Sequence, residues 1–227
     1  MNVALIWDHL SLVLSALILA VGVGVPLGLL AYLFPRFGKA ILWVVDLIQT
    51  VPALALLGII MVVMDPGSPT AVIGLTLYSL LPIVRNTSLG LSQVPEHLKE
   101  AATGMGMSGT YRLLHVEVPL AVPMLVTGIR IAAVNAIGTA VFASFVGGGG
   151  LGGLFYTAIR QENMGMIFVG TLVLMVMAFV LDAGLSYMEH RLSSHSRKKL
   201  PTPVKAVGST VLAVAGVALV VSMFLPA

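Results

Sequence analysis

The stretch LSLVLSALILAVGVGVPLGLLAYLFP, residues Leu10–Pro35, contains 26 consecutive residues without a charged side chain. An α-helix rises about 1.5 Å per residue, so roughly 20 apolar residues cross the hydrocarbon core of a bilayer. This stretch is therefore long enough to span a membrane as one helix. The residues before it, Met1–His9, include no Lys or Arg, so we expect the helix to be retained and not removed as a signal peptide.

The composition of the whole chain agrees with this interpretation. Of the 227 residues, 58% are hydrophobic and 9% are charged, whereas soluble domains have about 25% charged residues. So few charges cannot cover the surface of a soluble fold, and the sequence predicts an all-α integral membrane protein. Cysteine is absent, which excludes disulfides, thiol chemistry and Cys-ligated metal sites. The net charge of +3 comes without a basic patch, so we expect no nucleic-acid partner.

Five further apolar stretches extend this pattern along the chain. They are Ala40–Met64 (interrupted by Asp46 and Pro52), Thr70–Leu91, a segment between Leu120 and Val146, Asn163–Leu181 and Ala206–Ala227. We therefore expect about six transmembrane helices in a single membrane domain over residues 1–227. The longest polar segment, Ser92–Glu117, is too short for a nucleotide-binding domain, so any energy source must lie on another chain.

Basic residues fall almost entirely on one side of this arrangement. One side holds Arg160, and the other holds nine basic residues: Arg36, Lys39, Lys99, Arg112, Arg191, Arg197, Lys198, Lys199 and Lys205. Basic residues concentrate in cytoplasmic loops of membrane proteins. The pattern predicts that Ser92–Glu117 is cytoplasmic and that both termini lie outside.

The segment Ser92–Glu117, which we call the polar loop, is predicted to contain two short helices. Pro95–Met105 has an apolar stripe at helical spacing, formed by Leu98, Ala101, Ala102 and Met105. Three glycines then allow a sharp turn, and Ser108 can cap a second helix, Thr110–Glu117, which Pro119 should end. The pattern predicts a helix–turn–helix whose small-residue face could accept a partner at close range.

The polar loop resembles the EAA loop of ABC importer permeases. That motif reads E-A-A, three residues, G, nine residues, I-x-L-P. Here Glu100-Ala101-Ala102, Gly106 and Val116-Glu117-Val118-Pro119 match its spacing, with Val in place of Ile and of Leu. The resemblance implies the type I permease fold, over about residues 10–191, with a cytoplasmic pair of coupling helices. It also implies that Glu100, Ala101, Ala102, Gly106 and Pro119 couple the chain to an ATPase.

The same resemblance implies the partners of the chain. A cytosolic ATP-binding subunit would bind and hydrolyse ATP, so the chain itself would be non-catalytic and would hold no cofactor. A second permease copy or a paralogue would complete the pathway, and an external substrate-binding protein would deliver substrate. The expected location is the bacterial inner membrane, with several passes through its lipid.

Three other stretches resemble the osmoprotectant branch of that family, which imports glycine betaine, carnitine and choline. They are QTVPALALLG (Gln49–Gly58), LPIVRNT (Leu81–Thr87) and GGGGLGG (Gly147–Gly153). The last lacks the Lys-Ser/Thr of a phosphate-binding loop, so we expect a tight external turn. The expected function is therefore import of quaternary ammonium osmoprotectants. The alternatives are a methionine-type amino-acid ABC permease or an ATP-independent transporter. The last stretch, about residues 206–227, lies beyond the resemblance.

Polar residues within the spans are candidates for the translocation pathway. We expect Asp46, Gln49, Thr50 and Asn135 to face the interior of the bundle, with Pro52 opening a kink that frees a carbonyl. The residues alone leave open whether Gln49, Thr50 and Asn135 line a pathway or only bridge helices. Aromatic rings could receive a quaternary ammonium group, and the candidates are Tyr78, Phe142, Phe145 and Tyr156.

Charged residues near the spans suggest helix ends and ion pairs. We expect Arg85 and Arg130 to lie at the cytosolic ends of their spans, the latter because its span would begin at Ile131. Asp46 and Asp182 lie within spans, where pairing with basic neighbours would offset the cost of burying their charge.

Overall fold

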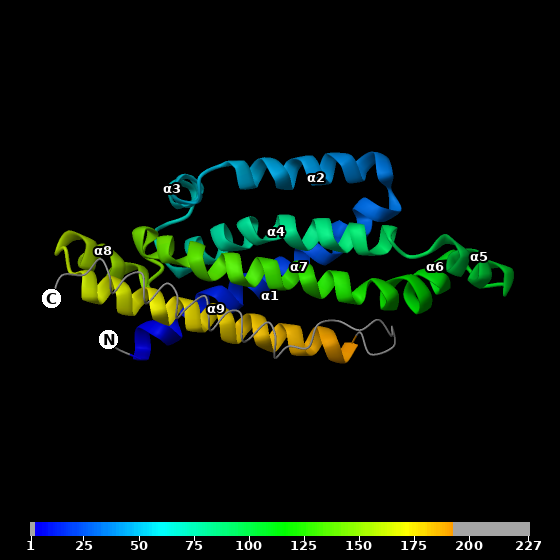
Figure 1. Cartoon of the computed structure of the whole chain (residues 1–227). Helices are drawn as coiled ribbons and strands as arrows, with labels where there is room; N and C mark the ends of the chain where they lie inside the picture. The colour runs from blue at the N-terminus through cyan, green and yellow to red at the C-terminus, as the bar shows by residue number, and fades with distance from the viewer. Residues whose placement is uncertain (1–2, 193–227) are drawn as a thin grey trace. The chain divides into compact units, whose positions relative to one another are not determined.

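The computed structural model describes residues 3–192, where every regular element is a helix. Long apolar helices that could each cross a bilayer are α1 (Val3–Leu33), α4 (Ser68–Ser92), α7 (Val118–Thr139), which a 3₁₀ turn (Ala140–Val146) extends, and α9 (Met164–Leu192). One more crossing results if α2 and α3 together form a span. The chain is thus a multi-pass, all-α membrane protein (Figure 1). The predicted span Ala206–Ala227 lies outside the described residues.

Three of the long helices form the core of residues 3–192. α1, α4 and α7 pack against one another, α9 packs against α7, and α2 lies against α1 and α4 (Figure 1). At two glycines the backbone of one helix lies directly against a neighbouring helix, with no room for a side chain. If Gly28 carried a Cβ, that atom would lie 2.5 Å from Thr87, and a Cβ on Gly128 would lie 2.7 Å from the Pro82 carbonyl oxygen. Close approach at small residues is the usual basis of helix association in membranes.

The predicted second span, Ala40–Met64, is not one continuous helix. It divides into α2 (Pro35–Thr50) and α3 (Ala53–Val63), which meet at an angle of 100°. Pro52 explains the break, because proline has no N–H and pushes the preceding residue out of the helical region. Val51 accordingly has extended dihedrals, with φ −71° and ψ 129°. The site of the predicted kink is right, but the helix is interrupted there.

The end of the polar loop also differs from the prediction, since Pro119 does not end a helix. Instead α6 (Gly109–Arg112), a π-helical turn (Leu113–Glu117) and α7 run on as one helix. Where the π turn meets α7, a backbone N–H bonds to the carbonyl five residues earlier. This wider turn accommodates the proline ring, which would clash in a regular α-helix.

At the other end of the core, the glycine-rich run forms the tight, close-packed turn that the sequence predicts. Gly147, Gly149 and Gly150 have φ between 79° and 80°, a left-handed conformation that glycine adopts without steric cost. A Cβ on Gly152, the first residue of α8 (Gly152–Arg160), would lie 1.9 Å from the Val141 carbonyl oxygen. The turn therefore requires glycine for both its dihedral angles and its packing.

A buried histidine fastens α1 to this turn. The ring of His9 is fully buried, and its Nδ1 accepts a hydrogen bond from the backbone N–H of Leu151 at 3.3 Å. The hydrogen is therefore on Nε2, which donates to the carbonyl oxygen of Ile137 at 3.0 Å. One neutral side chain thus joins the start of α1, the end of α7 and the glycine turn.

Candidate functional site

The polar loop consists of a short helix, a tight turn and the start of the long helix that continues into α7. α5 (Glu96–Gly104) is followed by Gly106, whose φ of 84° is in the left-handed region. Ser108 caps α6, because its Oγ accepts a hydrogen bond from the N–H of Tyr111 at 3.4 Å. The predicted turn and cap are both confirmed.

The residues that resemble the EAA motif lie largely on the surface of this loop. Glu100, Ala101, Gly106 and Pro119 are exposed, whereas Ala102 is buried. Of the predicted apolar stripe, Ala102 therefore packs into the chain, and three members remain exposed: Leu98, Ala101 and Met105. An exposed apolar stripe on a short helix is suited to packing against another protein. Its role as an ATPase contact stays a prediction.

Behind this surface lies a buried polar network that the sequence analysis missed. Glu117 is 1% exposed; its Oε1 accepts from Arg112 Nε at 2.7 Å, and its Oε2 accepts from the Tyr32 hydroxyl at 2.6 Å. Arg112 also donates from Nη1 to Thr103 Oγ1, at 2.9 Å. The network joins α1, α5, α6 and the π turn. The sequence offered no clear signal, because residues next to each other in a helix point to different faces, so the neighbouring Val116 and Val118 do not mark Glu117 as buried.

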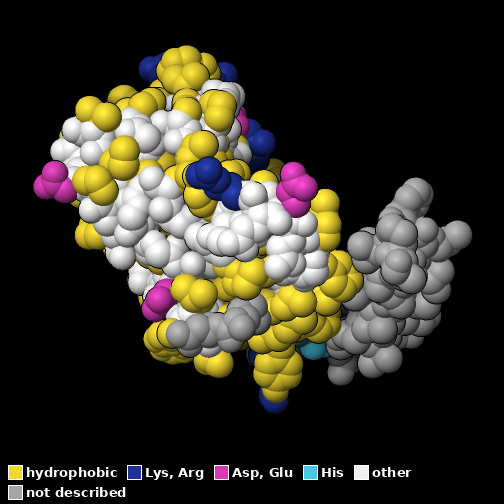
Figure 2. All heavy atoms as spheres, turned by 90° about the vertical axis from the view of Figure 1, so that its left-hand side faces the viewer, with side chains coloured by type: hydrophobic (Ala, Val, Ile, Leu, Met, Phe, Trp, Pro, Cys, Tyr) yellow, Lys and Arg dark blue, Asp and Glu magenta, His cyan; other side chains and the backbone are white. Residues whose placement is uncertain are grey.

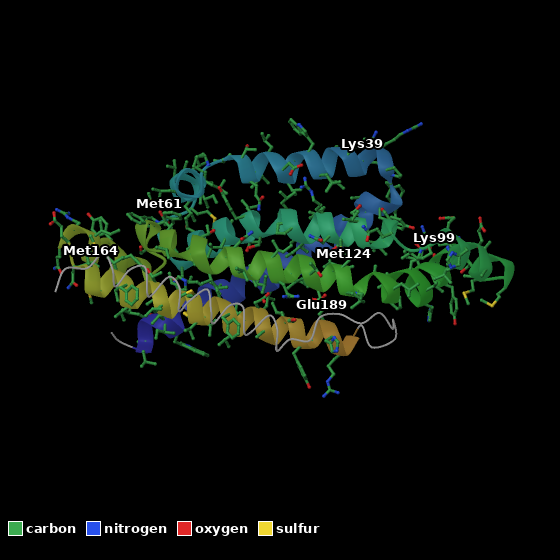
Figure 3. All side chains as sticks on the ribbon, in the orientation of Figure 1. Lys39, Met61, Lys99, Met124, Met164 and Glu189 are labelled. Carbon is green, nitrogen blue, oxygen red and sulfur yellow. The ribbon has the colours of Figure 1, made fainter. Side chains whose placement is uncertain are left out.

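Lys99 adds a positive charge beside this network, at the polar-loop end (Figure 3). Its Nζ lies 5.6 Å from the centre of the Tyr32 ring and 3.4 Å from Glu96 Oε2. Desolvation of the ammonium group works to lower the pKa of Lys99, but the interactions with Tyr32 and Glu96 outweigh it and raise the pKa. Lys99 therefore keeps its charge at neutral pH and holds α5 against the end of α1.

The structure does not bring the pathway candidates together in the interior of this chain. Gln49 is partly buried and donates to the Tyr78 carbonyl at 3.0 Å. Thr50 and Asn135 are exposed and so do not face the interior of a single copy, and their place along a pathway stays a prediction. Pro52 lies at the 100° break; the carbonyl four residues before it, on Ile48, accepts from the Val51 N–H at 3.3 Å, and the Val51 carbonyl accepts from the Tyr78 hydroxyl. The opened carbonyl thus has a partner within the chain.

Three of the four aromatic candidates form a cluster near α8. Phe142 and Phe145 have ring centres 6.5 Å apart, and Phe145 meets Tyr156 edge to face at 5.7 Å. Arg160 already lies over the Tyr156 ring at 5.7 Å and donates to its hydroxyl at 3.0 Å. A ligand cation would therefore compete with this arginine for the ring.

The charged residues within spans are paired, as predicted for Asp46 and Asp182. Arg85 Nη2 on α4 lies 2.8 Å from Asp46 on α2. Arg130 on α7 bonds to two acids on α9, Asp182 at 2.9 Å and Glu189 at 2.7 Å (Figure 3). α7 begins at Val118 and not at Ile131, so the helix extends beyond Arg130, and the position of Arg130 at the cytosolic end of the span stays a prediction. The arginine is an attachment point for α9.

The α8 end of the molecule shows no comparable charge cluster on the face that Figure 2 displays. Hydrophobic side chains are spread over that face between areas of backbone and other side chains, and the acidic and basic groups on its described residues are scattered among them (Figure 2). Within residues 3–192, moreover, no three His, Asp or Glu side chains are grouped to hold a metal ion. Glu117, at 1% exposed, is the most deeply buried carboxylate within residues 3–192.

Comparison with known proteins places the chain among transport components. A family model described as "binding-protein-dependent transport system inner membrane component" matches residues 20–194. The carnitine transport permease protein OpuCB of Listeria monocytogenes is 37% identical over 82% of this chain and 86% of its own length. The choline transport system permease protein OpuBB of Bacillus subtilis is 35% identical (86% and 89%), and the osmoprotectant import permease protein OsmW of Salmonella typhimurium is 39% identical (83% and 88%).

Solved structures support the fold independently. A chain of the MetNI methionine ABC transporter, in an inward-facing conformation, superposes with a TM-score of 0.75. The match covers 82% of this chain and 93% of the other, at 21% sequence identity. The likeness shows that the helices are arranged as in that transporter.

Proposed function

The chain belongs to the family of inner membrane components of binding-protein-dependent transport systems, and on this premise we propose that it is the permease subunit of an ATP-driven importer of quaternary ammonium osmoprotectants. Glycine betaine, carnitine and choline are the expected substrates. The observation that carries the proposal is the 35% to 39% identity to permeases named for carnitine, choline and osmoprotectants. The chain is an inner membrane protein and not an enzyme.

Several partners follow from this proposal. A separate cytosolic subunit binds and hydrolyses ATP, an external protein delivers substrate, and a second permease copy or paralogue completes the pathway. Glu100, Ala101, Gly106 and Pro119 contact the ATPase, which agrees with their exposure, and the buried Ala102 supports this surface from within the chain.

The pathway candidates fit the same assembly. Thr50 and Asn135 are exposed on a single copy, and polar groups facing lipid are unfavourable. A second permease subunit and a wet pathway would give these side chains a polar neighbour. Gln49 and Pro52, at the break between α2 and α3, are proposed to lie along that pathway.

The substrate test is uptake of labelled glycine betaine, carnitine, choline and methionine by cells that carry the complete transporter. Gly106→Val should abolish uptake, because a β-branched residue cannot easily adopt a φ of 84°. Gly104→Ala is the matched control, since its Cβ meets no atom within 4 Å. If Gly106→Val leaves osmoprotectant uptake intact and removes methionine uptake, the chain is a methionine-type permease.

That methionine-type alternative has one observation in its favour, the TM-score of 0.75 to a methionine transporter. At 21% identity this likeness supports the fold and not the substrate. The family match argues against the other alternative, an ATP-independent transporter.

A further inference from the structure

We propose that the network of Tyr32, Thr103, Arg112 and Glu117 transmits movement of the polar loop to α1, and that Glu117 is a positioning residue for transport. The inference rests on the proposed function, because it concerns how force from an ATPase reaches the membrane helices. It is carried by the geometry of the network and by the connectivity of the helices around it.

The connectivity shows why α1 needs such a link. The polar loop follows α4 in the chain and continues into α7 as one helix, so the backbone moves both helices when the loop moves. α1 has no such covalent connection to the loop. The hydroxyl of Tyr32, on α1, donates a hydrogen bond to Glu117 at 2.6 Å, although the two residues are 85 positions apart in sequence. This bond connects α1 directly to the polar loop.

The charges and burial make this connection stiff. Both carboxylate oxygens of Glu117 are occupied at 2.6 Å and 2.7 Å, and the side chain is 2% exposed. A buried charge that loses its partners is strongly unfavourable, so the network resists separation. Through Arg112 it also reaches Thr103 on α5, the helix with the exposed apolar stripe.

The π turn provides the local geometry for this contact. It inserts an extra residue into the helix that runs from α6 into α7, and such turns are frequent at functional sites. Within Leu113–Glu117, Leu114 is 55% exposed, whereas Glu117 faces the interior. The same turn therefore accommodates Pro119 and directs the carboxylate towards α1.

The decisive experiment measures whether α5 and α1 move together. The chain has no cysteine, so His97→Cys on α5 and Leu30→Cys on α1 introduce one pair of spin labels in a copy that is assembled with an unlabelled second permease subunit. In the complex with its ATPase, we expect the distance distribution between the labels to be the same with and without ATP. With Tyr32→Phe or Glu117→Gln added, ATP should shift or broaden it. A shift in the otherwise unmodified pair would overturn the proposal.

Transport in proteoliposomes gives the second readout. Tyr32→Phe removes one hydroxyl and should lower the glycine betaine imported per ATP hydrolysed by at least about tenfold, the factor expected for loss of one hydrogen bond to a charged group. The control is Tyr187→Phe, which removes a surface hydroxyl bonded to Arg191 on α9. An unchanged ratio, or equal falls in transport and ATP hydrolysis, would contradict a transmitting role.

The two proposals fail in different ways. If the unmodified complex imports none of glycine betaine, carnitine and choline, the proposed substrate class is wrong. The label distances depend on ATP alone and still decide whether the network couples α5 to α1.

Discussion

α1 is attached at each end by one neutral side chain, and the two attachments use different chemistry. At the glycine-turn end (residues 9 and 147–153), His9 bonds to backbone atoms of Ile137 and Leu151. At the polar-loop end, Tyr32 donates to the buried carboxylate of Glu117. The first attachment depends on close-packed backbone, and the second depends on charge balance. The glycine-turn end should therefore be sensitive to added volume, and the polar-loop end to lost charge.

The strongest test of this difference is Gly152→Val, for which we expect a loss of more than about 4 kcal/mol of unfolding free energy. A Cβ there would lie 1.9 Å from a backbone oxygen that cannot move freely. The measurement is the yield of monodisperse protein in detergent and its melting temperature. Gly153→Ala is the control, with no atom within 4 Å of its Cβ, and should change stability by less than about 0.5 kcal/mol. Similar behaviour of the two variants would refute the volume argument.

At the polar-loop end, Arg112→Met should cost about 3 kcal/mol, because it leaves the Glu117 carboxylate buried without its cation. The double variant Arg112→Met/Glu117→Gln should be more stable than Arg112→Met alone, since the uncompensated charge is gone. Thermal melts of the single and double variants in the same detergent measure this. If the double variant instead loses as much stability as the two substitutions do in sum, packing volume and not charge determines the stability of the polar-loop end as well.

His9→Leu comes next, with an expected cost of about 2 kcal/mol from the unpaired N–H of Leu151. His9→Gln should cost less, because its amide can still donate to the Ile137 carbonyl. Melting temperatures rank the variants, and hydrogen exchange around residue 151 reports the freed amide. If His9→Leu has the same melting temperature as the wild type, the hydrogen bonds of His9 do not stabilise the glycine turn.

The smallest effect is expected for Glu96→Gln, at less than about 0.5 kcal/mol. Glu96 pairs with Lys99 at 3.4 Å in the same loop as Glu117, but its side chain is 73% exposed. This variant removes a charged group that is exposed, so it distinguishes the effect of losing a charge from the effect of losing a buried charge. The contribution of the Glu96–Lys99 pair to the unfolding free energy should vanish in high salt. A loss as large as that of Arg112→Met would mean that burial is not what makes Glu117 important.

Much of the fold was predictable because it depends on local composition. Long apolar runs fix the helices of a membrane protein, and Ser108 and Gly106 mark a cap and a turn through their own backbone preferences. The break at Pro52 was located, but its 100° angle depends on how α3 packs on α4 and the 3₁₀ turn. The continuation of the helix through Pro119 was missed, because the π turn that permits it has no simple sequence signature.

The candidate site was predictable only where it lies within one segment. The turn and the exposed stripe of the polar loop depend on residues that are close together in the sequence, so both could be predicted from the spacing of those residues. The partner of Glu117 on α1 is 85 residues away, and no periodicity relates the two. The partners of Arg130 are similarly remote, because its acids belong to α9, 52 and 59 residues further along.

The unbroken helix from α6 through α7 restricts how the protein can move. Its contacts with α1, at Glu117 and Ile137, are about 20 residues apart, or roughly 30 Å along the axis. A helix that contacts its neighbour at one point can rotate about that contact, but two distant contacts prevent the rotation. α1 and α7 are therefore expected to move together as one rigid unit. Any cycle of opening and closing must bend the chain elsewhere, and the joint between α2 and α3 is where it is already bent by 100°.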